Sequence, residues 1–292
     1  MSNEDIKIAV VGGDLRQLVA ARNLAAEGYE TAAYGFGGGR EYGDAVRAKT
    51  LSDAVHGARV VVLPVHFSQD GKKISTPLSE EEIYLGELLR LMEKDQFLLA
   101  GVVSKAFYGV CEARGITVED YMANEELAVM NAVPTAEGAL SIAIEASPKT
   151  IKDSKIIVIG YGRIGKILSR MLRALDADVT VCARRREAVT WAQACGCKGA
   201  YMNALPYAEA DIIFNTVPTM VLGRDLLQTL PKDTLIIDLA SKPGGVDLES
   251  AKRLGLDVIW ALSLPGKVAP VTAGEYIKET VISLMKRHGI LS

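Results

Sequence analysis

Short apolar runs alternate with longer amphipathic segments along the whole chain. The runs are rich in Val and Ile, which is typical of strands buried on both faces of a parallel sheet. The predicted strands are 6–11, 30–34, 59–63, 96–100 and 116–118, then 156–159, 178–182, 211–215, 234–238 and 257–261. The alternation of such strands with helices predicts an α/β fold with helices on both faces of parallel sheets.

Helical periodicity and capping residues predict the intervening helices. The predicted helices are 15–27, 80–93, 104–114, 124–130, 135–146, 163–175 and 272–288. Ser79 is the expected N-cap of the second helix. The segment 131–135, which contains a proline, is expected to break the chain before Thr135 caps a new helix. Residues 67–77 lack periodicity and are expected to form a loop.

A length of 292 residues favours two domains over one. We predict two doubly wound parallel-sheet domains, of which the C-terminal one is a NAD(P)-binding Rossmann fold. The predicted boundaries are 1–125 for a flavodoxin- or Rossmann-like domain, 126–150 for a hinge helix, 151–270 for the Rossmann domain and 271–292 for a helix that packs back on the domain junction.

A glycine-rich turn stands between a predicted strand and a predicted helix. Gly160, Gly162 and Gly165 fill the spacing G-x-G-x-x-G. In that motif the first glycine permits the turn, the second lets the backbone approach a pyrophosphate, and the third allows close helix packing. The helix that begins near Arg163 and Ile164 points its N–H groups at the phosphate. We therefore expect dinucleotide binding here, the alternative being a purely structural βαβ turn.

The residues after the next strand distinguish NAD from NADP. NAD sites place an acidic residue there for the ribose 2′-hydroxyl, whereas NADP sites supply an Arg for the 2′-phosphate. This chain has Arg184, Arg185 and Arg186, with no acidic residue before Glu187. Guanidinium groups bind a phosphate in a bidentate fork, and a carboxylate would repel it. We therefore expect NADP, the alternative being a solvated basic turn.

Gly12, Gly13 and Asp14 form a second glycine turn after the first predicted strand. Its pattern is incomplete, because Arg16 stands where a further glycine would be needed. A second dinucleotide site is therefore not expected. A small anion bound by Arg16 and a tight turn with a surface Arg are both open interpretations.

Composition limits the class of protein. The net charge of −3 argues against nucleic acid as a main partner. The four cysteines are too few for a disulfide framework, and Cys195 and Cys197 lack the spacing and the second pair of a zinc site, so no metal is expected. The chain shows no signal-peptide pattern and no uninterrupted apolar run of about 18 residues, so we expect a cytoplasmic protein without membrane contact.

Three of the later strands end in loops rich in Pro, Gly and Ser, at the sheet edge where a dinucleotide would lie. The candidate cofactor contacts in these loops are Thr216, Val217, Pro218, Asp238, Ala240, Leu262 and Pro265.

Five motifs carry a family resemblance: GGDLRQL (12–18), NAVPTAEG (131–138), IGYGRIG (159–165), DLASKPGGVD (238–247) and LPGKVAPVTAG (264–274). Together they resemble the A subunits of bacterial dipicolinate synthases, from residue 6 to about 285. The two-domain layout is also similar to D-2-hydroxyacid dehydrogenases and adenosylhomocysteine hydrolase. In those families the N-terminal domain carries part of the substrate site and the second domain holds the nicotinamide.

The resemblance implies oxidation of dihydrodipicolinate to dipicolinate with NADP⁺, together with a flavoprotein-like B subunit, in the mother cell of a spore-forming bacterium. A dihydropyridine needs to lose only a hydride and a proton to become aromatic. The enzyme must therefore chiefly bind a dicarboxylate and hold its ring against the nicotinamide. The sequence leaves open whether the chain also forms a homo-oligomer.

A dicarboxylate needs cationic or hydroxyl anchors. Ser241 and Lys242 are expected beside the nicotinamide, where Lys242 could pair a carboxylate, although a surface lysine is an equal alternative. The other candidate substrate-binding residues are Asn131, Thr135, Ser104, Lys105 and Arg16. Helix capping alone would also account for Thr135.

The histidines are His56, His66 and His288, and only His66, at a strand's end, could face the cleft as proton acceptor. A structural role is the alternative. D-2-hydroxyacid dehydrogenases use a His–acid pair late in the chain, and none is present here. This argues against hydroxyacid oxidation, which must remove a hydroxyl proton. Two alternatives remain open: a dehydrogenase of another small carboxylic acid, and a non-catalytic NADP(H)-binding partner protein.

Overall fold

The computed structural model describes residues 5–202 and 209–291, and all the predicted site residues lie within these ranges. The chain divides into two compact units. Unit 1 comprises the chain up to Met130 together with the segment from Ala269 onward, and unit 2 comprises Asn131–Val268. Each unit is built around a parallel sheet, which confirms the predicted α/β fold class.

Unit 1 contains a parallel sheet with the order β3-β2-β1-β4-β7-β8. Numbered within the sheet, this is the order 3-2-1-4-5-6 of Rossmann sheets rather than the flavodoxin order. The elements are β1 (Lys7–Val11), α1 (Leu15–Ala26), β2 (Glu30–Tyr34), β3 (Val46–Arg47), α2 (Leu51–Val55), β4 (Val60–Val62), β5 (Lys73–Ile74), β6 (Ile83–Tyr84), α3 (Leu85–Leu91), β7 (Phe97–Ala100), α4 (Lys105–Ala113), β8 (Thr117–Asp120) and the 3₁₀ turn η2 (Tyr121–Ala123).

Alternate residues of β1 serve the two faces of this sheet. Ile8 and Val10 pack with α1 and with the C-terminal helix α11 (Pro270–Arg287) in one apolar core. Ala9 and Val11 pack with α2, α3 and α4 in a second core on the opposite face. The apolar runs of the sequence therefore read as continuous because both faces of each strand are covered.

The segment after β4 differs from the prediction. Residues 67–77 were expected to form a loop and 80–93 a helix with Ser79 as N-cap. Instead β5 and β6 form an antiparallel pair, and α3 begins at Leu85. Ile74 and Ile83 pair across this hairpin, and both are buried in the core beside α3. Burial of these two side chains holds residues 83–84 extended, so the predicted helix start at Ser79 is wrong.

Helix α5 (Glu125–Ala146) runs through the predicted break. Pro134 lies inside it, and the Thr135 hydroxyl donates to the carbonyl of Asn131 at 2.7 Å. Thr135 is therefore a mid-helix residue, and the prediction that it caps a new helix is wrong. A proline removes one hydrogen bond from a helix, a cost that tertiary packing can offset. The boundary between the two units falls within α5.

The apolar composition of α5 is explained by its packing. Among the described residues it is the one helix long and apolar enough to cross a membrane, and 44% of its most apolar window is buried in the protein. Leu127 lies in a core of unit 1, while Ala136, Ala139 and Ala143 lie in a core of unit 2.

Helix α11 packs against α1 inside unit 1, whereas the prediction placed the C-terminal helix on the domain junction. A Cβ at Gly274 would lie 2.7 Å from Val19, so the two helices are in close contact. Lys278 on α11 is buried and forms ion pairs with Glu27 and Glu275. Apolar residues of α11, among them Ile277, complete the core over one face of the sheet.

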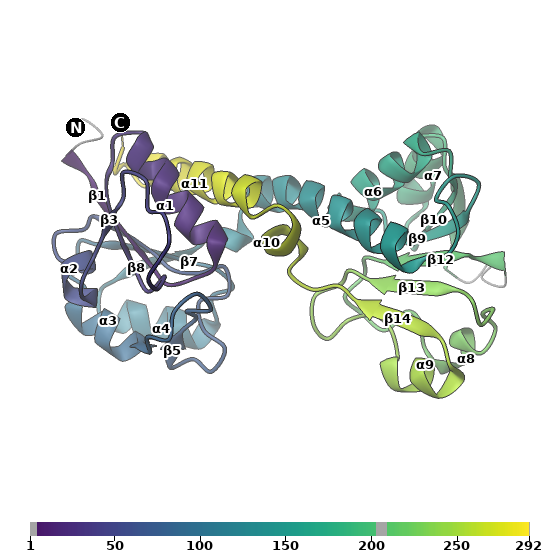
Figure 1. Ribbon diagram of the computed structural model, residues 1–292, viewed down its shortest axis with the longest axis horizontal. Coiled ribbons are helices and arrows are strands. Elements are labelled where there is room, and N and C mark those ends of the chain that lie inside the picture. The colour runs from purple at the N-terminus through teal and green to yellow at the C-terminus, as the bar shows by residue number, and fades with distance from the viewer. Residues whose placement is uncertain (1–4, 203–208, 292) are drawn as a thin grey trace. The chain divides into compact units, whose positions relative to one another are not determined.

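Unit 2 repeats the Rossmann order, as β11-β10-β9-β12-β13-β14. Helices α6 and α7 cover one face of this sheet, and α8 and α9 cover the other (Figure 1). The elements are β9 (Lys155–Ile159), α6 (Arg163–Ala174), β10 (Asp178–Ala183), α7 (Arg186–Ala194), β11 (Lys198–Tyr201), β12 (Ile212–Asn215), α8 (Arg224–Leu227), β13 (Leu235–Asp238), α9 (Leu248–Leu254), β14 (Asp257–Trp260) and α10 (Leu264–Val268).

Asp211 holds the start of β9 in place. It accepts from the backbone N–H of Lys155 at 2.8 Å and from Lys149 Nζ at 2.6 Å. Partial burial alone would raise the pKa of Asp211, but the hydrogen bonds from Lys149 and Lys155 outweigh it and lower that pKa below its usual value.

The substitution Asp211→Asn is expected to lower the free energy of unfolding by about 1 kcal/mol at pH 7. Because the folded-state pKa is depressed, this stability is present above the unfolded pKa and is lost as the pH falls through the folded pKa. The difference between wild type and variant in urea titrations should therefore begin to shrink below about pH 4 and should vanish only once the pH lies below the folded-state pKa. Asp233→Asn, which changes an exposed carboxylate 3.4 Å from the same lysine, is the control and should change little. A difference that persists at low pH would contradict this account.

Candidate functional site

The glycine turn between β9 and α6 leaves no room for side chains at two positions. Gly160 has a φ of +96°, and a Cβ there would lie 2.3 Å from the hydroxyl of Thr216. A Cβ at Gly165 would lie 2.2 Å from the carbonyl of Gly160. Thr216 donates its hydroxyl to Ile159 at 2.9 Å, which fixes the loop after β12 against the turn. The turn therefore lies between β9 and β12, where the strand order reverses and Rossmann folds bind their ligands.

The middle glycine of the motif is open to a ligand. Gly162 is the N-cap of α6, is exposed, and has no protein atom within 4 Å of where a Cβ would stand. No side chain caps this helix start, so its first-turn amides and positive dipole end can bind a pyrophosphate. The start of α1 is different, because Asp14 caps it and Gln17 completes a capping box. A carboxylate at that position disfavours an anion.

Tyr161 lies within the turn and was not singled out from the sequence. Its ring is half-buried beside Lys166, whose Nζ lies 6.0 Å from the ring centroid. Burial, together with a hydrogen bond to Cys195, raises the pKa of the Tyr161 hydroxyl. The hydroxyl therefore stays neutral at physiological pH.

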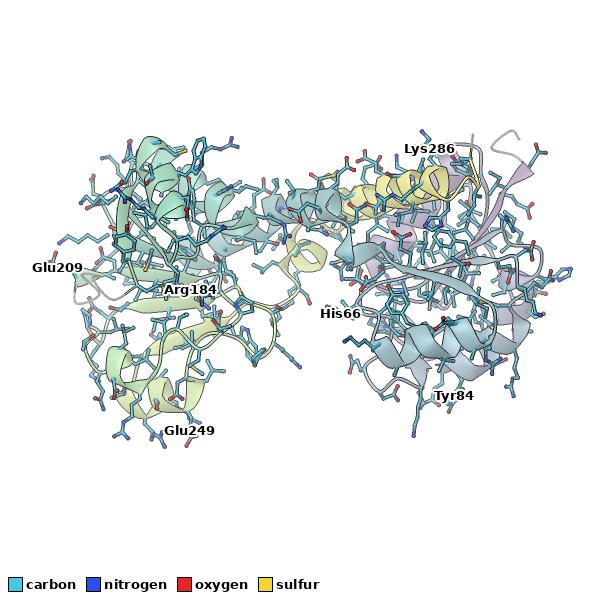
Figure 2. The ribbon with its side chains drawn as sticks, turned by 180° about the vertical axis from the view of Figure 1, so that it is seen from behind. His66, Tyr84, Arg184, Glu209, Glu249 and Lys286 are labelled. Atoms are coloured by element: carbon cyan, nitrogen blue, oxygen red, sulfur yellow. The ribbon has the colours of Figure 1, made fainter. Side chains whose placement is uncertain are left out.

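The predicted arginine pair follows β10 directly. Cys182 pairs with Ile159 in the sheet register, which places Arg184 and Arg185 at the same edge as the glycine turn. Both side chains are exposed, and neither forms an ion pair with any residue that the structure describes. The side chain of Arg184 can be located in Figure 2. Two unpaired guanidinium groups next to a dinucleotide turn fit the 2′-phosphate of NADP.

A buried polar network organises the ends of β12 and β13. Asn215 and Asp238 are 0% and 1% exposed, and Asn215 Nδ2 donates to Asp238 Oδ1 at 2.7 Å. Asp238 also accepts from the N–H groups of Ala240 at 3.0 Å and Gly245 at 2.9 Å. Asn215 Oδ1 accepts from the N–H of Val217 at 3.0 Å. The predicted contacts Asp238 and Ala240 are thus buried, and Asp238 shapes the loops around the site as a positioning residue.

The substitution Asp238→Ala is expected to lower the free energy of unfolding by about 3 kcal/mol, because it leaves three buried donors without their acceptor. Asp238→Asn keeps one acceptor and should cost less. Chemical denaturation measures both variants, with the exposed Asp257→Ala as control. A loss below about 0.5 kcal/mol for Asp238→Ala would contradict the role of the network.

The other candidates of unit 2 have different surroundings. Ser241 and Lys242 are exposed in the loop after β13, as is Pro218 after β12. Thr216 and Val217 are half-buried, as are Leu262 and Pro265 around the start of α10. Asn131 on α5 has a buried Oδ1 with no hydrogen-bond partner among the described residues. A buried acceptor without a donor is unfavourable, so a ligand or water is expected to supply one.

The candidates of unit 1 lie along the C-terminal edge of its sheet. His66 follows β4 and is exposed (Figure 2), and Ser104 caps α4 by accepting from the N–H of Phe107 at 3.2 Å. The rings of Phe67 and Phe107 lie 4.6 Å apart, so the structure brings the segments of His66, Ser104 and Lys105 together.

Arg16 does not fit the predicted anion site. Its side chain is buried and its guanidinium is bonded to Asp14, with Nη2 2.7 Å from Oδ2. The Asp14 carboxylate therefore already neutralises it. The sequence signal for this was Asp14 itself, followed three residues later by Gln17, which is a capping-box pattern. No group of His, Cys, Asp and Glu suited to a metal occurs among the described residues.

Comparison with known proteins supports this interpretation of the two units. Residues 7–122 match the family described as the N-terminal domain of the dipicolinate synthase A subunit. Residues 135–243 match the NAD-binding domain of D-isomer-specific 2-hydroxyacid dehydrogenases. The A subunit of dipicolinate synthase from Bacillus subtilis (strain 168) is 30% identical over 290 residues, which cover 96% of each protein.

Solved structures of dipicolinate synthase A subunits have the same fold as this chain. The dipicolinate synthase A subunit from Bacillus halodurans superposes with a TM-score of 0.90 at 27% identity, over 98% of this chain and 99% of the other. Its counterpart from Bacillus subtilis gives 0.86 at 30% identity, over 98% of each chain. A transhydrogenase from Sinorhizobium meliloti, at 15% identity and a TM-score of 0.73, shares the fold.

The fold and the glycine turn define an oxidoreductase-type protein with a nicotinamide-nucleotide-binding Rossmann domain. The sequence identity to a relative over nearly the full length then identifies the family within this class. The chain belongs to the family of dipicolinate synthase A subunits, which confirms the resemblance predicted from its motifs.

Proposed function

We propose that the chain is the A subunit of a dipicolinate synthase and oxidises dihydrodipicolinate to dipicolinate with NADP⁺. The observation that carries this is the uncapped start of α6 next to the unpaired Arg184 and Arg185, in a chain of this family. The relatives are named as subunits, which supports a second protein, the B subunit, as partner. We place the protein in the cytoplasm of the mother cell of a spore-forming bacterium.

The residues of unit 2 fit the cofactor. The amides at the start of α6 would bind the pyrophosphate, and Arg184 and Arg185 the 2′-phosphate. Thr216, which is fixed to Ile159, would border the nicotinamide. When bound, NADP⁺ supplies the hydride acceptor.

The substrate would be held by cationic and polar groups. Lys242, exposed in the loop after β13, would pair one carboxylate, with Ser241 beside it. Asn131, whose Oδ1 has no partner among the described residues, would contact the substrate through its side-chain amide. Ser104 and Lys105 would bind the second carboxylate, but Arg16 is left out because Asp14 already neutralises it.

The proton of aromatisation needs only a modest base. All three histidines are in unit 1, and His66 lies at the C-terminal edge of its sheet. We propose His66 as the acceptor. A carbon-bound proton that leaves as the ring becomes aromatic can be accepted by a weaker base than the hydroxyl proton of a hydroxy acid.

The test mixes the purified full chain with NADP⁺ and freshly generated dihydrodipicolinate, with and without the partner protein, and follows absorbance of the reduced nicotinamide. Formation of NADPH and dipicolinate in equal amounts is expected. Tight NADPH binding without hydride transfer, even with the partner, would instead favour a non-catalytic role. Turnover only with a hydroxy acid would favour a different dehydrogenase.

The substitution Lys242→Ala is expected to raise KM for dihydrodipicolinate about tenfold, because a charge-assisted hydrogen bond to a carboxylate is lost. NADP⁺ affinity should not change. Lys252→Ala, an exposed lysine on α9, is the matched control. An unchanged KM would remove Lys242 from the substrate site.

A further inference from the structure

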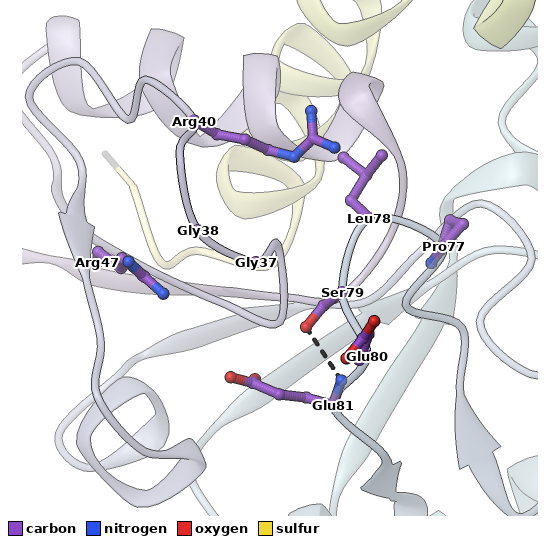
Figure 3. A pocket seen from close by; sticks show the side chains of 9 residues that line it. All are labelled: Gly37, Gly38, Arg40, Arg47, Pro77, Leu78, Ser79, Glu80 and Glu81. Atoms are coloured by element: carbon purple, nitrogen blue, oxygen red, sulfur yellow. Dashed lines mark hydrogen bonds between the residues drawn. The ribbon is translucent and has the colours of Figure 1, made fainter.

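Unit 1 has a pocket that the proposed function does not use (Figure 3). Its volume is about 670 Å³, and its walls are the segments 37–47 and 77–81. An adjoining hollow of about 400 Å³ shares Arg47 and Glu81 with it and reaches Tyr34, Tyr42 and Lys49. Both lie past the C-terminal ends of β2 and β3, and volumes of this size accommodate small metabolites.

The pocket lies at an open part of this sheet edge. The β5–β6 hairpin covers the glycine turn after β1, where the N–H of Gly13 donates to the carbonyl of Ser75 at 2.8 Å. Asp14 caps the helix that follows. The position of a pyrophosphate is therefore filled by the protein itself. The region beyond the C-terminal end of β2 is not filled in this way. In a mononucleotide-binding half of a Rossmann fold, this region receives a ribose.

The two walls approach each other closely at Gly37. Gly37 has a φ of +74°, and a Cβ there would lie 2.5 Å from the carbonyl of Leu78 on the opposite wall. The Tyr42 hydroxyl donates to the carbonyl of Gly37 at 3.0 Å, and Ser79 accepts from the N–H of Glu81 at 3.1 Å. The two hydrogen bonds brace each wall internally, and the close approach at Gly37 sets the spacing between the walls.

One wall carries cations whose charge is not balanced by any ion pair within the described residues, namely Arg40, Arg47 and Lys49. Arg40 Nε donates to the carbonyl of Phe36 at 3.1 Å, and the Arg47 guanidinium lies 5.9 Å from the centroid of Tyr42. These neutral partners orient both guanidinium groups and leave other N–H donors available. Such donors bind phosphoryl oxygens in pairs.

The opposite wall carries Glu80 and Glu81 (Figure 3). Burial and the nearby Glu81 carboxylate raise the pKa of Tyr34. Carboxylates bind hydroxyl donors and repel anions. The pocket therefore offers a phosphoryl-binding side and a separate hydroxyl-binding side.

We propose that this pocket binds a small metabolite that carries both a phosphoryl group and vicinal hydroxyls, such as a sugar phosphate or a nucleoside monophosphate. Arg40 and Arg47 hold the phosphoryl oxygens, and Glu80 and Glu81 accept hydrogen bonds from the hydroxyls. The site is separate from the dinucleotide site of unit 2 and does not depend on the proposed reaction.

Isothermal titration of the full chain with ribose 5-phosphate, AMP, ribose and inorganic phosphate tests the proposal, in the presence of saturating NADPH so that unit 2 is occupied. Ribose 5-phosphate is expected to bind at least about tenfold more tightly than ribose or phosphate alone. The double variant Arg40→Ala/Arg47→Ala should lose at least about tenfold in its affinity for ribose 5-phosphate. Glu81→Gln should weaken ribose 5-phosphate but not inorganic phosphate.

Arg90→Ala, an exposed arginine of α3 outside the pocket, should leave binding unchanged. AMP binding more tightly than ribose 5-phosphate would support a nucleotide as the source of the ribose phosphate, and the reverse order would support a free sugar phosphate. Absence of binding by both would overturn the proposal. So would equal affinity for inorganic phosphate, or full retention of binding by the double variant.

Discussion

Replacing Gly162 by Val should lower the affinity for NADPH by about 100-fold and leave the melting temperature of the chain almost unchanged. Gly162 has an ordinary φ of −84°, and nothing in the protein lies within 4 Å of a Cβ built on it. The folded chain therefore tolerates a side chain there. A bound pyrophosphate does not, because it must approach the amides at the start of α6 at this point.

Gly223→Val is the matched control. Gly223 is the N-cap of α8 in the same unit, has a φ of −78°, and also has open space at its Cβ position. It should affect neither NADPH affinity nor melting temperature. Fluorescence titration with NADPH and a thermal melt measure both variants. Equal affinities for Gly162→Val and Gly223→Val would show that the nucleotide does not use this turn.

The double variant Arg184→Ala/Arg185→Ala is expected to bind NADP⁺ about 30–100-fold more weakly, with less than about a threefold change for NAD⁺. Both guanidinium groups stand past β10 without a carboxylate partner among the described residues. Their N–H donors can therefore bind the 2′-phosphate, which is the one group that distinguishes NADP⁺ from NAD⁺.

Arg170→Ala/Arg224→Ala serves as its control, since both arginines are exposed in unit 2 away from the end of β10. Dissociation constants for NADP⁺ and NAD⁺ are compared at one salt concentration, because charge contacts are screened. Equal losses for the two cofactors in Arg184→Ala/Arg185→Ala would remove the assignment to NADP.

The strands of both sheets could be predicted because each is buried on both faces. The runs at 156–159 and 234–238 contain little besides β-branched and aliphatic residues, and they match β9 and β13 to within one residue. The hairpin β5–β6 could not be predicted in the same way. Its strands have two residues each, too few to show a period, and they form because Ile74 and Ile83 meet over the core.

The course of α5 shows where a local rule fails. Pro134 predicts a break, because it removes a hydrogen bond and clashes with the preceding turn. The helix continues because Leu127 and Ala136, on either side of the proline, are both buried in apolar cores. Such burial depends on segments far away in the sequence, so the sequence around Pro134 does not reveal it.

In the candidate site, too, local features could be predicted from the sequence, whereas contacts between distant segments could not. The glycine turn is a local feature, and its spacing alone predicted the roles that the geometry of Gly160 and Gly165 supports. The pairing of Asn215 with Asp238 joins two strands 23 residues apart and could be found only in the fold. Asp238 was consequently predicted as a direct cofactor contact, whereas its buried carboxylate positions the surrounding loops.

A crystal structure of the full chain with NADP⁺ tests the central claim most directly. The account predicts the pyrophosphate on the amides at the start of α6 beside Gly162, with the 2′-phosphate between Arg184 and Arg185. Density for the nucleotide in unit 1, or at another edge of unit 2, would contradict it.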